Sequence, residues 1–478
     1  MCEDKKLSVS KLKRLGQYWR SWQHFGTPMM LSKAWEKYVV DKKRFRSGNK
    51  SIVPFFDTAA ICEADIKAPD SYSPVSICYL THYFFPDKQG GTERFILNLA
   101  KEQKRFGNRV RVITLGKRSL DQYSHQTEGI CWEEFSYDGI PVTQIRYVRA
   151  PRGLYYDEIL PEDASMLAFA QEALARYKPD IVHFAYPQPF AAFAAACVQS
   201  GIPYCVTLTD FSIFCHYATM VCKDGAFCAG SDEGKKCERR CRTYGVSDVQ
   251  KRYRNARLML CRALTITVPS RFVAAVMRQE FPDIPMCVIA HGIGTAFSPS
   301  RVRGETKQFV YVGTLSELKG VHLLIDAFRQ LKADVTLQIC GGGVPEYREQ
   351  LERHAAGDPR ISFSGEIRAE DMPAIYEQAD CVVVPSIWYE TYNFVVREAL
   401  ACRCLCVASN MGAMPEAIRE GRNGFLFEAG NALSLREALE KAIHFDWSGY
   451  SQSAFADPET EAVSYRNIYQ LAKVGIDG

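Results

Sequence analysis

The sequence predicts an α/β protein with two doubly wound, Rossmann-like domains that face each other across a cleft. Two observations predict this fold. From residue 74 onward, short apolar runs alternate with stretches of helical periodicity, and near residue 308 the pattern restarts with its own first strand and glycine turns. Strands that alternate with helices pair in parallel through right-handed crossovers. Ligands of such folds bind at the carboxyl ends of the strands, so the cleft is the expected site.

Apolar runs define the expected strands, and amphipathic stretches define the expected helices. In the first domain, residues 74–300, we expect strands at 76–83, 108–116, 139–148, 180–186, 203–210 and 263–270, and helices at 90–107 and 162–177. In the second domain, residues 301–458, we expect strands at 308–315, 335–343, 361–367, 381–386, 405–409 and 424–430, and a helix at 321–331. A last helix is expected at 459–474, after Pro458.

Charge is unevenly distributed along the 478 residues. Residues 1–50 contain 13 Lys or Arg and 4 Asp or Glu, whereas the rest of the chain carries a net charge of −5. A mildly acidic body argues against a wide nucleic-acid footprint, so no nucleic-acid partner is expected. The sequence shows neither an apolar run of about 20 residues nor a secretory signal, which predicts a cytoplasmic protein.

Residues 1–73 are expected to form a basic helical extension followed by a linker. Leu12, Leu15, Trp19 and Trp22 recur at spacings of three and four residues, so they share one face of a helix flanked by Lys and Arg. One interpretation is peripheral contact of residues 1–50 with the inner face of an anionic membrane. The other is packing of the Trp stripe on the main domain, and the sequence leaves both open.

Two segments of the second domain suggest a site for a phosphorylated sugar. In VYVGTLSELKG, Gly313 ends a strand and Lys319 precedes Gly320 at the mouth of a helix, where backbone N–H groups and a cation suit a diphosphate. In PSIWYETYNFVVREALACRC, Glu390 lies in a loop and Glu398 follows inside the next helix. Two carboxylates placed there can accept hydrogen bonds from sugar hydroxyls.

The first domain has a matching feature in THYFFPDKQGGTERF. Gly90 and Gly91 follow a strand and open a helix, so a ligand's phosphate can approach the backbone amides.

Together these motifs resemble the GT-B-fold glycosyltransferases of the large retaining family four, over about residues 75–475. The resemblance also rests on IAHGIGTAFSP at 289–299, and on Pro415-Glu416 and Asn423-Gly424-Phe425 near the end. It implies that Gly91 lies against the donor and that Lys319 neutralises the diphosphate. It further implies that Glu390 contacts the donor sugar, that Glu398 binds the ribose, and that the segment 459–478 crosses back to the first domain.

The predicted site follows from this resemblance. The donor-binding set is Gly90, Gly91, Gly313, Thr314, Lys319, Glu390, Thr391, Tyr392, Asn393, Phe394 and Glu398, and the catalytic set is Lys319, Glu390 and Asp210. Three positions depart from the family pattern. Thr314 stands where an Arg is usual, Thr209 where a His is usual, and Asn393 where a Gly is usual.

Residues 209–241 form an unusual insert in the first domain. Its five cysteines are candidate metal ligands: Cys215, Cys222, Cys228, Cys237 and Cys241. The surrounding stretch is polar and is not expected to bury these cysteines. Three alternatives remain open for them: a structural zinc site or iron–sulfur cluster, free thiols, or disulfides.

The resulting hypothesis is a retaining, hexosyltransferase-like enzyme that moves a sugar from a nucleotide sugar to a glycan or lipid-linked acceptor, as in surface polysaccharide synthesis. Transfer would require no metal, because Lys319 and helix N-termini would stabilise the departing diphosphate. Two alternatives stay open. One is a sugar-nucleotide epimerase of the same fold, and the other is a catalytically weak scaffold that acts through the cysteine insert.

Overall fold

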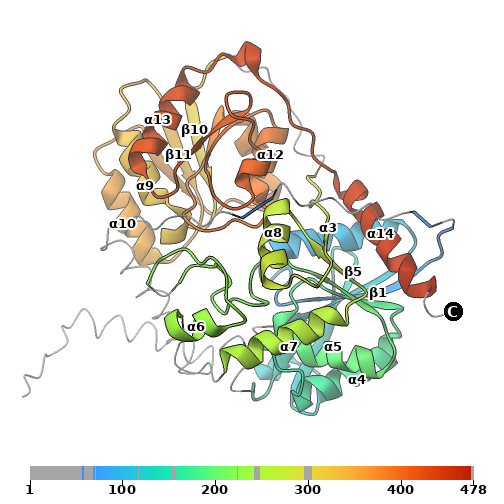
Figure 1. The fold of residues 1–478 in the computed structure, drawn as a ribbon. Coiled ribbons are helices and arrows are strands. Elements are labelled where there is room, and N and C mark those ends of the chain that lie inside the picture. The colour runs from blue at the N-terminus through green and yellow to red at the C-terminus, as the bar shows by residue number, and fades with distance from the viewer. Residues whose placement is uncertain are drawn as a thin grey trace, which may run out of the picture.

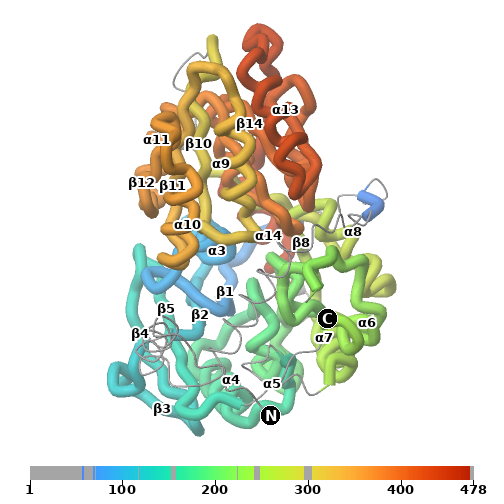
Figure 2. Tube along the Cα trace, turned by 90° about the vertical axis from the view of Figure 1, so that its left-hand side faces the viewer, coloured from blue at the N-terminus to red at the C-terminus, as the bar shows by residue number. Residues whose placement is uncertain are grey.

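The computed structural model describes residues 56–58, 68–69, 71–116, 118–151, 158–222, 224–241, 248–294 and 304–474. These residues form two Rossmann-like α/β domains, which lie one above the other in Figure 1 and in the turned view of Figure 2. The fold class predicted from the sequence is therefore confirmed. The predicted helices and Trp stripe of residues 1–50 lie outside the described residues.

The N-terminal domain is built on a nine-stranded sheet with the order β3-β4-β5-β2-β1-β6-β7-β8-β9. Its strands are β1 Ser76–Thr81, β2 Arg109–Leu115, β3 His125–Thr127, β4 Ile130–Tyr137, β5 Ile140–Tyr147, β6 Ile181–Phe184, β7 Tyr204–Thr207, β8 Thr265–Val268 and β9 Cys287–Val288. Within this order, every pair of neighbouring strands in the part β5-β2-β1-β6-β7-β8-β9 is parallel. Most buried residues of the sheet are apolar, as expected for strands covered on both faces, but His183, Thr207 and Thr267 are buried polar residues on its central strands.

The strands β3 and β4 were not predicted from the sequence. They pair antiparallel with each other and with β5, so they form a hairpin at the edge of the sheet. In β4 only the first three residues are buried, and half-buried and exposed residues alternate after them, while β3 has just three residues. A continuous apolar run is therefore missing here, and that run was the signal used for the other strands.

Helices cover both faces of the N-terminal sheet. They are α3 Gly91–Arg105, α4 Ala164–Tyr177, α5 Ala191–Gln199, α6 Lys235–Arg240, α7 Val249–Cys261 and α8 Arg271–Glu280. The predicted helices at 90–107 and 162–177 correspond to α3 and α4. The helix α5 is rich in alanine and nearly all buried, so it lacks the polar face that helical periodicity would reveal.

The C-terminal domain contains a six-stranded, entirely parallel sheet with the order β12-β11-β10-β13-β14-β15. Its strands are β10 Gln308–Val312, β11 Thr336–Cys340, β12 Ile361–Gly365, β13 Cys381–Val384, β14 Leu405–Ser409 and β15 Gly424–Phe427. Its helices are α9 Val321–Arg329, α10 Pro345–Ala355, α11 Met372–Gln378, α12 Phe394–Ala401 and α13 Ala432–Ile443. Every strand expected here is present, one to three residues shorter in most cases.

The last helix, α14 (Pro458–Val474), leaves the C-terminal domain and packs beside α3 and β1 of the N-terminal domain (Figure 1). Tyr465 and Tyr469 are fully buried in the apolar cluster of that domain. The Tyr469 hydroxyl lies 2.7 Å from Nδ1 of His183 on β6. Glu461 accepts a hydrogen bond from the backbone N–H of Gly292 at 2.8 Å. The helix therefore ties the two domains together.

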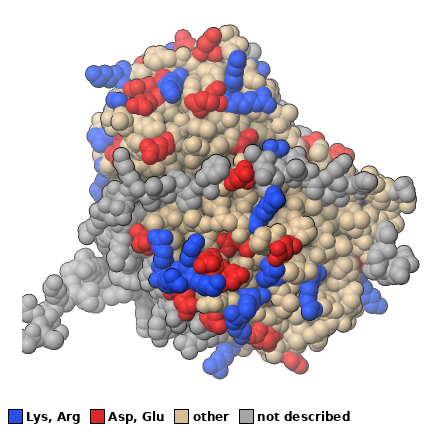
Figure 3. Space-filling view, viewed as in Figure 1, with Lys and Arg blue, Asp and Glu red and all other residues tan. Residues whose placement is uncertain are grey.

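Charged side chains on the face shown in Figure 3 gather over α6 and α7, where Lys and Arg alternate with Asp and Glu. Several of them form ion pairs, among them Lys251–Glu162 at 2.7 Å and Arg257–Asp283 at 3.0 Å. Among the described residues, no helix combines the length and the apolar character that crossing a membrane requires.

Candidate functional site at the domain boundary

The predicted donor residues gather where α3 of the N-terminal domain meets α12 of the C-terminal domain. A Cβ atom added to Gly91, the first residue of α3, would lie 3.4 Å from the ring of Phe394, the first residue of α12. The N-terminal ends of both helices therefore lie at the same boundary (Figure 1). Helix N-termini provide unpaired N–H groups and positive potential, which favour anions.

Lys319 and Glu390 form an ion pair at this boundary. The Lys319 ammonium lies 2.7 Å from Oε1 of Glu390 and 5.0 Å from the centre of the Trp388 ring. Glu390 Oε1 also accepts hydrogen bonds from the Ser386 hydroxyl at 2.6 Å and the Trp388 indole N–H at 2.8 Å. All of these bonds use the same carboxylate oxygen. Within the described part of the chain, Oε2 receives no hydrogen bond, so it is available to a ligand.

The buried position of Glu390 opposes its ionisation, but its partners outweigh this effect. Burial raises the pKa of the carboxyl, whereas the charge of Lys319 and the hydrogen bonds from Lys319, Ser386 and Trp388 lower it. The net result is a pKa below the ordinary carboxyl value. Glu390 is therefore a charged hydrogen-bond acceptor at neutral pH.

Two glycines let the loops around this ion pair approach one another. Gly320 has φ +70°, and a Cβ atom there would lie 2.0 Å from the carbonyl oxygen of Pro385. Gly412 has φ +63°, and a Cβ atom there would lie 2.3 Å from the carbonyl oxygen of Glu390. A side chain at either position would both strain the backbone and push the loop away. These glycines thus set the distance between the Lys319 and Glu390 loops.

The loop after Glu390 contributes contacts between the domains. The Thr391 hydroxyl donates to the carbonyl of Thr209 at 2.8 Å, and the Thr209 hydroxyl lies 3.0 Å from that of Thr92 on α3. Asn393 is in the left-handed conformation, φ +64°, and its side chain caps α12 by accepting from Val396 N–H. Asn tolerates this conformation better than other non-glycine residues, which explains why Asn can replace Gly here.

Glu398 is buried inside α12 and bound from two directions. Its Oε1 contacts the guanidinium of Arg94, which extends from α3 across the domain boundary. Its Oε2 accepts a hydrogen bond from the Tyr376 hydroxyl at 2.9 Å. Phe394 lies under the same guanidinium, with its ring centre 5.3 Å from Cζ of Arg94. Glu398 is thus one turn away from the α12 N-terminus and faces the boundary.

Not all predicted residues join this group of contacts. Gly313 adopts φ +150°, and Thr314 beside it is exposed, with its carbonyl bound by the Tyr311 hydroxyl at 2.9 Å. Asp210 accepts a hydrogen bond from Ser212 N–H at 2.8 Å in a local turn. Tyr392 is buried and directs its hydroxyl to the carbonyl of His291 rather than to a ligand position. Catalysis by Asp210 therefore stays a prediction.

The carboxyl ends of β1 and β6 present a second group of side chains in the N-terminal domain. The rings of His82 and Tyr186 stack with their centres 3.9 Å apart. The buried carboxylate of Glu93 lies 3.9 Å from both His82 Nε2 and the Lys88 ammonium. An aromatic face beside charged groups at this position is the kind of surface that binds a sugar or another polar acceptor.

The five cysteines of the insert are mostly buried, contrary to the expectation from its polar sequence. Cys222, Cys237 and Cys241 pack with Val249 of α7 in a small apolar cluster, and Cys228 borders it. Cys215 belongs to the main core of the N-terminal domain. Many charged residues of the insert are exposed, but Ser212, His216 and Ser231 are buried as well. Local sequence polarity was therefore a poor guide to burial here.

The insert does not assemble a metal site in this structure. Within the described ranges, which include all five cysteines, no three His, Cys, Asp or Glu side chains are placed so that they could hold a metal ion. The Cys222 thiol does form side-chain hydrogen bonds with Cys228 and Cys241, so three of the five thiols lie together. A metal at the insert therefore stays a prediction.

The insert nevertheless contacts the donor loop through aromatic rings. Phe227 of the insert lies 5.6 Å from Tyr389, the residue before Glu390. Phe272 of α8 stacks on the same tyrosine at 5.4 Å, and Phe56, which precedes the N-terminal domain, packs edge-on against both. This aromatic cluster joins three segments of the chain behind Glu390.

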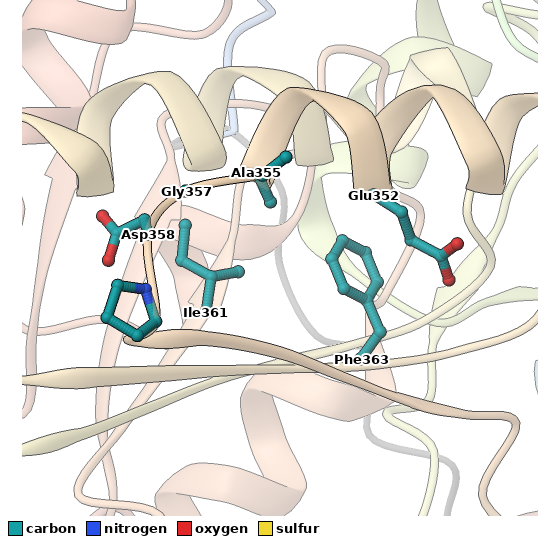
Figure 4. Close-up of a pocket in the computed structure, with 8 residues that line it drawn as sticks. Glu352, Ala355, Gly357, Asp358, Ile361 and Phe363 are labelled. Atoms are coloured by element: carbon teal, nitrogen blue, oxygen red, sulfur yellow. The ribbon is translucent and has the colours of Figure 1, made fainter.

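A separate surface hollow lies between the end of α10 and the edge strand β12 (Figure 4). It is lined by Glu352, Ala355, Ala356, Gly357, Asp358, Pro359, Ile361 and Phe363. None of the predicted donor residues is among them. Since β12 is at the edge of its sheet, the hollow is also distant from the strand ends that carry Lys319 and Glu390, and we assign it no role in donor binding.

Several site residues were missed by sequence reasoning. Arg94 is part of the Gly-Gly-Thr-Glu-Arg motif, and Ser386 and Trp388 precede Glu390 by four and two positions. The signal available in the sequence was that each of these three residues lies close to a residue already predicted for the site. Tyr376 offers no such signal, because it reaches Glu398 from a different helix.

Comparisons with known proteins identify the family and the fold of the chain. Two family profiles match the chain: "Glycosyltransferase Family 4" over residues 89–297 and "Glycosyl transferases group 1" over residues 306–444. Among curated proteins, the chain is 33% identical over 150 residues to a D-inositol 3-phosphate glycosyltransferase of Corynebacterium efficiens. It is 30% identical over 161 residues to an alpha-maltose-1-phosphate synthase of Mycobacterium tuberculosis. These alignments cover 29% and 32% of this chain, and only 35% and 39% of the relatives.

Solved structures match over most of the chain. Sucrose-phosphate synthase from Thermosynechococcus elongatus superposes with a TM-score of 0.57 at 19% identity, covering 83% of this chain and 94% of the other. HepE of Anabaena, in complex with UDP-glucose, superposes with a TM-score of 0.55 at 19% identity, covering 84% and 99%. At this identity the likeness establishes the fold, which is that of GT-B glycosyltransferases.

Proposed function

Because the chain belongs to the group 1, family 4 glycosyltransferases, we propose that it transfers a hexosyl group from a nucleotide sugar to an acceptor with retention of anomeric configuration. The observation that carries the proposal is the Lys319–Glu390 pair at the boundary of the two domains. It combines a cation suited to a diphosphate with a charged carboxylate whose second oxygen is available to sugar hydroxyls. The structures of HepE with UDP and UDP-glucose support a uridine nucleotide as the first donor to test.

The proposed reaction proceeds by attack on the face that the diphosphate leaves. The bond between the anomeric carbon and the diphosphate oxygen breaks, and a bond from the acceptor oxygen to that carbon forms on the same face. The acceptor's proton moves to the departing phosphate oxygen. In this proposal Lys319 and the α12 N-terminus stabilise the negative charge that develops on the leaving group. Glu390 holds the sugar in position through its hydroxyls.

The acceptor would bind to the N-terminal domain, on the surface formed by His82 and Tyr186. The stacked rings offer an apolar face for a sugar ring, and the buried carboxylate of Glu93 places a negative charge beside them. A glycan or a lipid-linked sugar fits this chemistry, as in surface polysaccharide synthesis. The basic residues 1–50 would then hold the enzyme at the inner face of the membrane that carries such an acceptor.

The proposal is tested by incubating the protein with UDP-, GDP- and ADP-sugars and measuring release of the nucleoside diphosphate. Thermal stabilisation by each nucleotide gives an independent measure of binding, since a ligand at 100 times its Kd adds about 2.7 kcal/mol. We expect at least one donor to bind and to be consumed, slowly with water and faster with an acceptor. The product's anomeric configuration, measured by NMR, should equal that of the donor.

Each alternative has its own outcome in this experiment. A scaffold would bind a nucleotide without consuming any donor. An epimerase would convert the sugar nucleotide into an isomer without releasing the nucleoside diphosphate. Failure to bind any nucleotide, by a folded protein, would contradict the proposed donor site. A product of inverted configuration would refute retention alone.

A further inference from the structure

We propose that Arg94 of the N-terminal domain is a second cation for the donor diphosphate, and that it exchanges Glu398 for this ligand when the donor binds. This inference rests on the proposed function, because it assumes that a nucleotide sugar occupies the domain boundary. It adds a residue from the opposite domain to a site otherwise built from the C-terminal domain. The exchange would also couple donor binding to the contact between the domains.

The charge of the site is the first argument. Glu390 and Glu398 bring two carboxylates to the boundary. The C-terminal domain provides the ammonium of Lys319, which contacts Glu390, whereas the cation in contact with Glu398 is Arg94 of the N-terminal domain. Without Arg94 these groups carry a net negative charge, to which the diphosphate adds more. A site of that charge repels its ligand. The guanidinium of Arg94 removes this excess and offers several N–H donors that suit phosphate oxygens.

Other nearby arginines do not fill this role in the described structure. Arg397, inside α12, is buried and donates to the carbonyl oxygens of Tyr392 and Ala413. Arg368 is on the surface, where it pairs with Glu370 at 2.7 Å and Asp371 at 2.8 Å. Arg94 differs from both, because its side chain is 32% exposed and extends across the boundary.

The position of Arg94 is the second argument. It lies in the first turn of α3, three residues after Gly91, and its guanidinium stands over Phe394 at the start of α12. The diphosphate is expected between these two helix N-termini, within reach of Lys319. Arg94 therefore needs only a change of side-chain rotamer to move from Glu398 to a phosphate oxygen.

The pairing of Glu398 is the third argument. One carboxylate oxygen is occupied by Arg94 and the other by Tyr376. A ribose hydroxyl that donates to Oε1 must compete with Arg94 for it, and the guanidinium then needs a new acceptor. The diphosphate, one ribose away, is that acceptor. Buried charges are costly unless paired, so the exchange keeps both Glu398 and Arg94 satisfied in the bound state.

The test compares nucleotides that differ only in phosphate content. Affinities of UDP, UMP and uridine, and of the GDP and ADP series, are measured by calorimetry for the wild type, Arg94→Met and Arg94→Lys. The control is Lys101→Met. Lys101 lies on the same helix as Arg94, and its ammonium pairs with Asp138 on the surface. A double variant, Arg94→Met with Glu398→Gln, removes the charge that Arg94→Met would leave unpaired.

We expect Arg94→Met to lower affinity for the diphosphate about 10- to 100-fold and to leave affinity for the nucleoside unchanged or higher. Arg94→Lys should recover part of the loss, and Lys101→Met should behave as the wild type. The selective loss of diphosphate affinity should persist when the double variant is compared with Glu398→Gln. Equal changes for diphosphate and nucleoside would overturn the inference while leaving the proposed function intact. A wild-type protein that binds no nucleotide would instead refute the proposed function.

Discussion

The donor loop after β13 and the cysteine insert after β7 both leave the carboxyl end of a strand, and each is organised around a buried carboxylate. In the donor loop, Glu390 is paired with Lys319, and its pKa is lowered although burial opposes this. At the insert, Glu280 of α8 binds the N–H of Ser231 at 2.6 Å and its hydroxyl, and burial prevails, so its pKa is raised. The first carboxylate is prepared for a polar ligand. The second serves as an anchor.

This difference has a simple physical origin. A buried carboxylate keeps its charge when a cation repays the lost hydration, and it tends to become neutral when only dipoles are available. Functional carboxylates can therefore be distinguished from structural ones by their partners rather than by their burial. The predictions below test this distinction between the two regions.

The largest effect is expected for Lys319→Met in the donor loop. The substitution removes the cation that stabilises the leaving diphosphate and leaves Glu390 charged and unpaired. We expect kcat/KM for transfer to fall about 100- to 1000-fold, as measured by release of the nucleoside diphosphate. Lys332→Met, at an exposed position of the same domain, is the control and should keep full activity. Equal activity of the two variants would remove Lys319 from the site.

A smaller effect is expected for Glu398→Gln, the second carboxylate of the donor region. The amide keeps the shape but loses a charged acceptor for the ribose, so donor affinity should fall about 10- to 150-fold. Calorimetry with the nucleoside should show the same loss, because the ribose is part of that ligand. Glu437→Gln, on the exposed face of α13, provides the matched control. A loss confined to the diphosphate would contradict ribose binding by Glu398.

The two regions are linked by the ring contact between Phe227 and Tyr389, which the variant Phe227→Ala removes. Aromatic pairs contribute about 0.5–1.5 kcal/mol beyond burial. Since Tyr389 precedes Glu390, we expect donor affinity to fall about 2- to 10-fold through a looser donor loop. Phe363→Ala is the control, because Phe363 is similarly half-buried but lies on the edge strand β12. Donor affinity equal to the wild type would show that the insert does not support the loop.

The sequence predicted the domain pattern because parallel strands are continuous apolar runs, a local signal. It predicted Lys319 because this residue follows a strand end and precedes Gly320, and it predicted Glu390 because this carboxylate lies in the loop between a strand and a helix. It did not predict Arg94 as the partner of Glu398, since these residues are 304 positions apart and meet only through docking of the domains. Burial of the insert's thiols was missed for a similar reason, because Val249, which packs against three of them, lies outside the insert.

The smallest effect concerns the pH dependence of stability, where Glu280 and Glu390 should behave in opposite ways. Glu280 has a raised pKa in the folded protein, so its contribution is fully present below the ordinary carboxyl pKa and is lost as the pH rises through the raised value. Glu390 has a lowered pKa, so its contribution is present above the ordinary value and is lost as the pH falls through the lowered one. Thermal midpoints measured between about pH 3 and 8 for the wild type, Glu280→Gln and Glu390→Gln isolate each contribution, because the Glu390 contribution changes below the ordinary carboxyl pKa.

Relative to the wild type, Glu280→Gln should gain stability as the pH rises, by a few degrees at most, while keeping its donor affinity. Glu390→Gln should instead lose stability relative to the wild type as the pH rises through the acid end of the range, and it should also bind the donor poorly. Parallel pH profiles for the two variants would mean that the carboxylates have the same environment, against the contrast drawn between the donor loop and the insert.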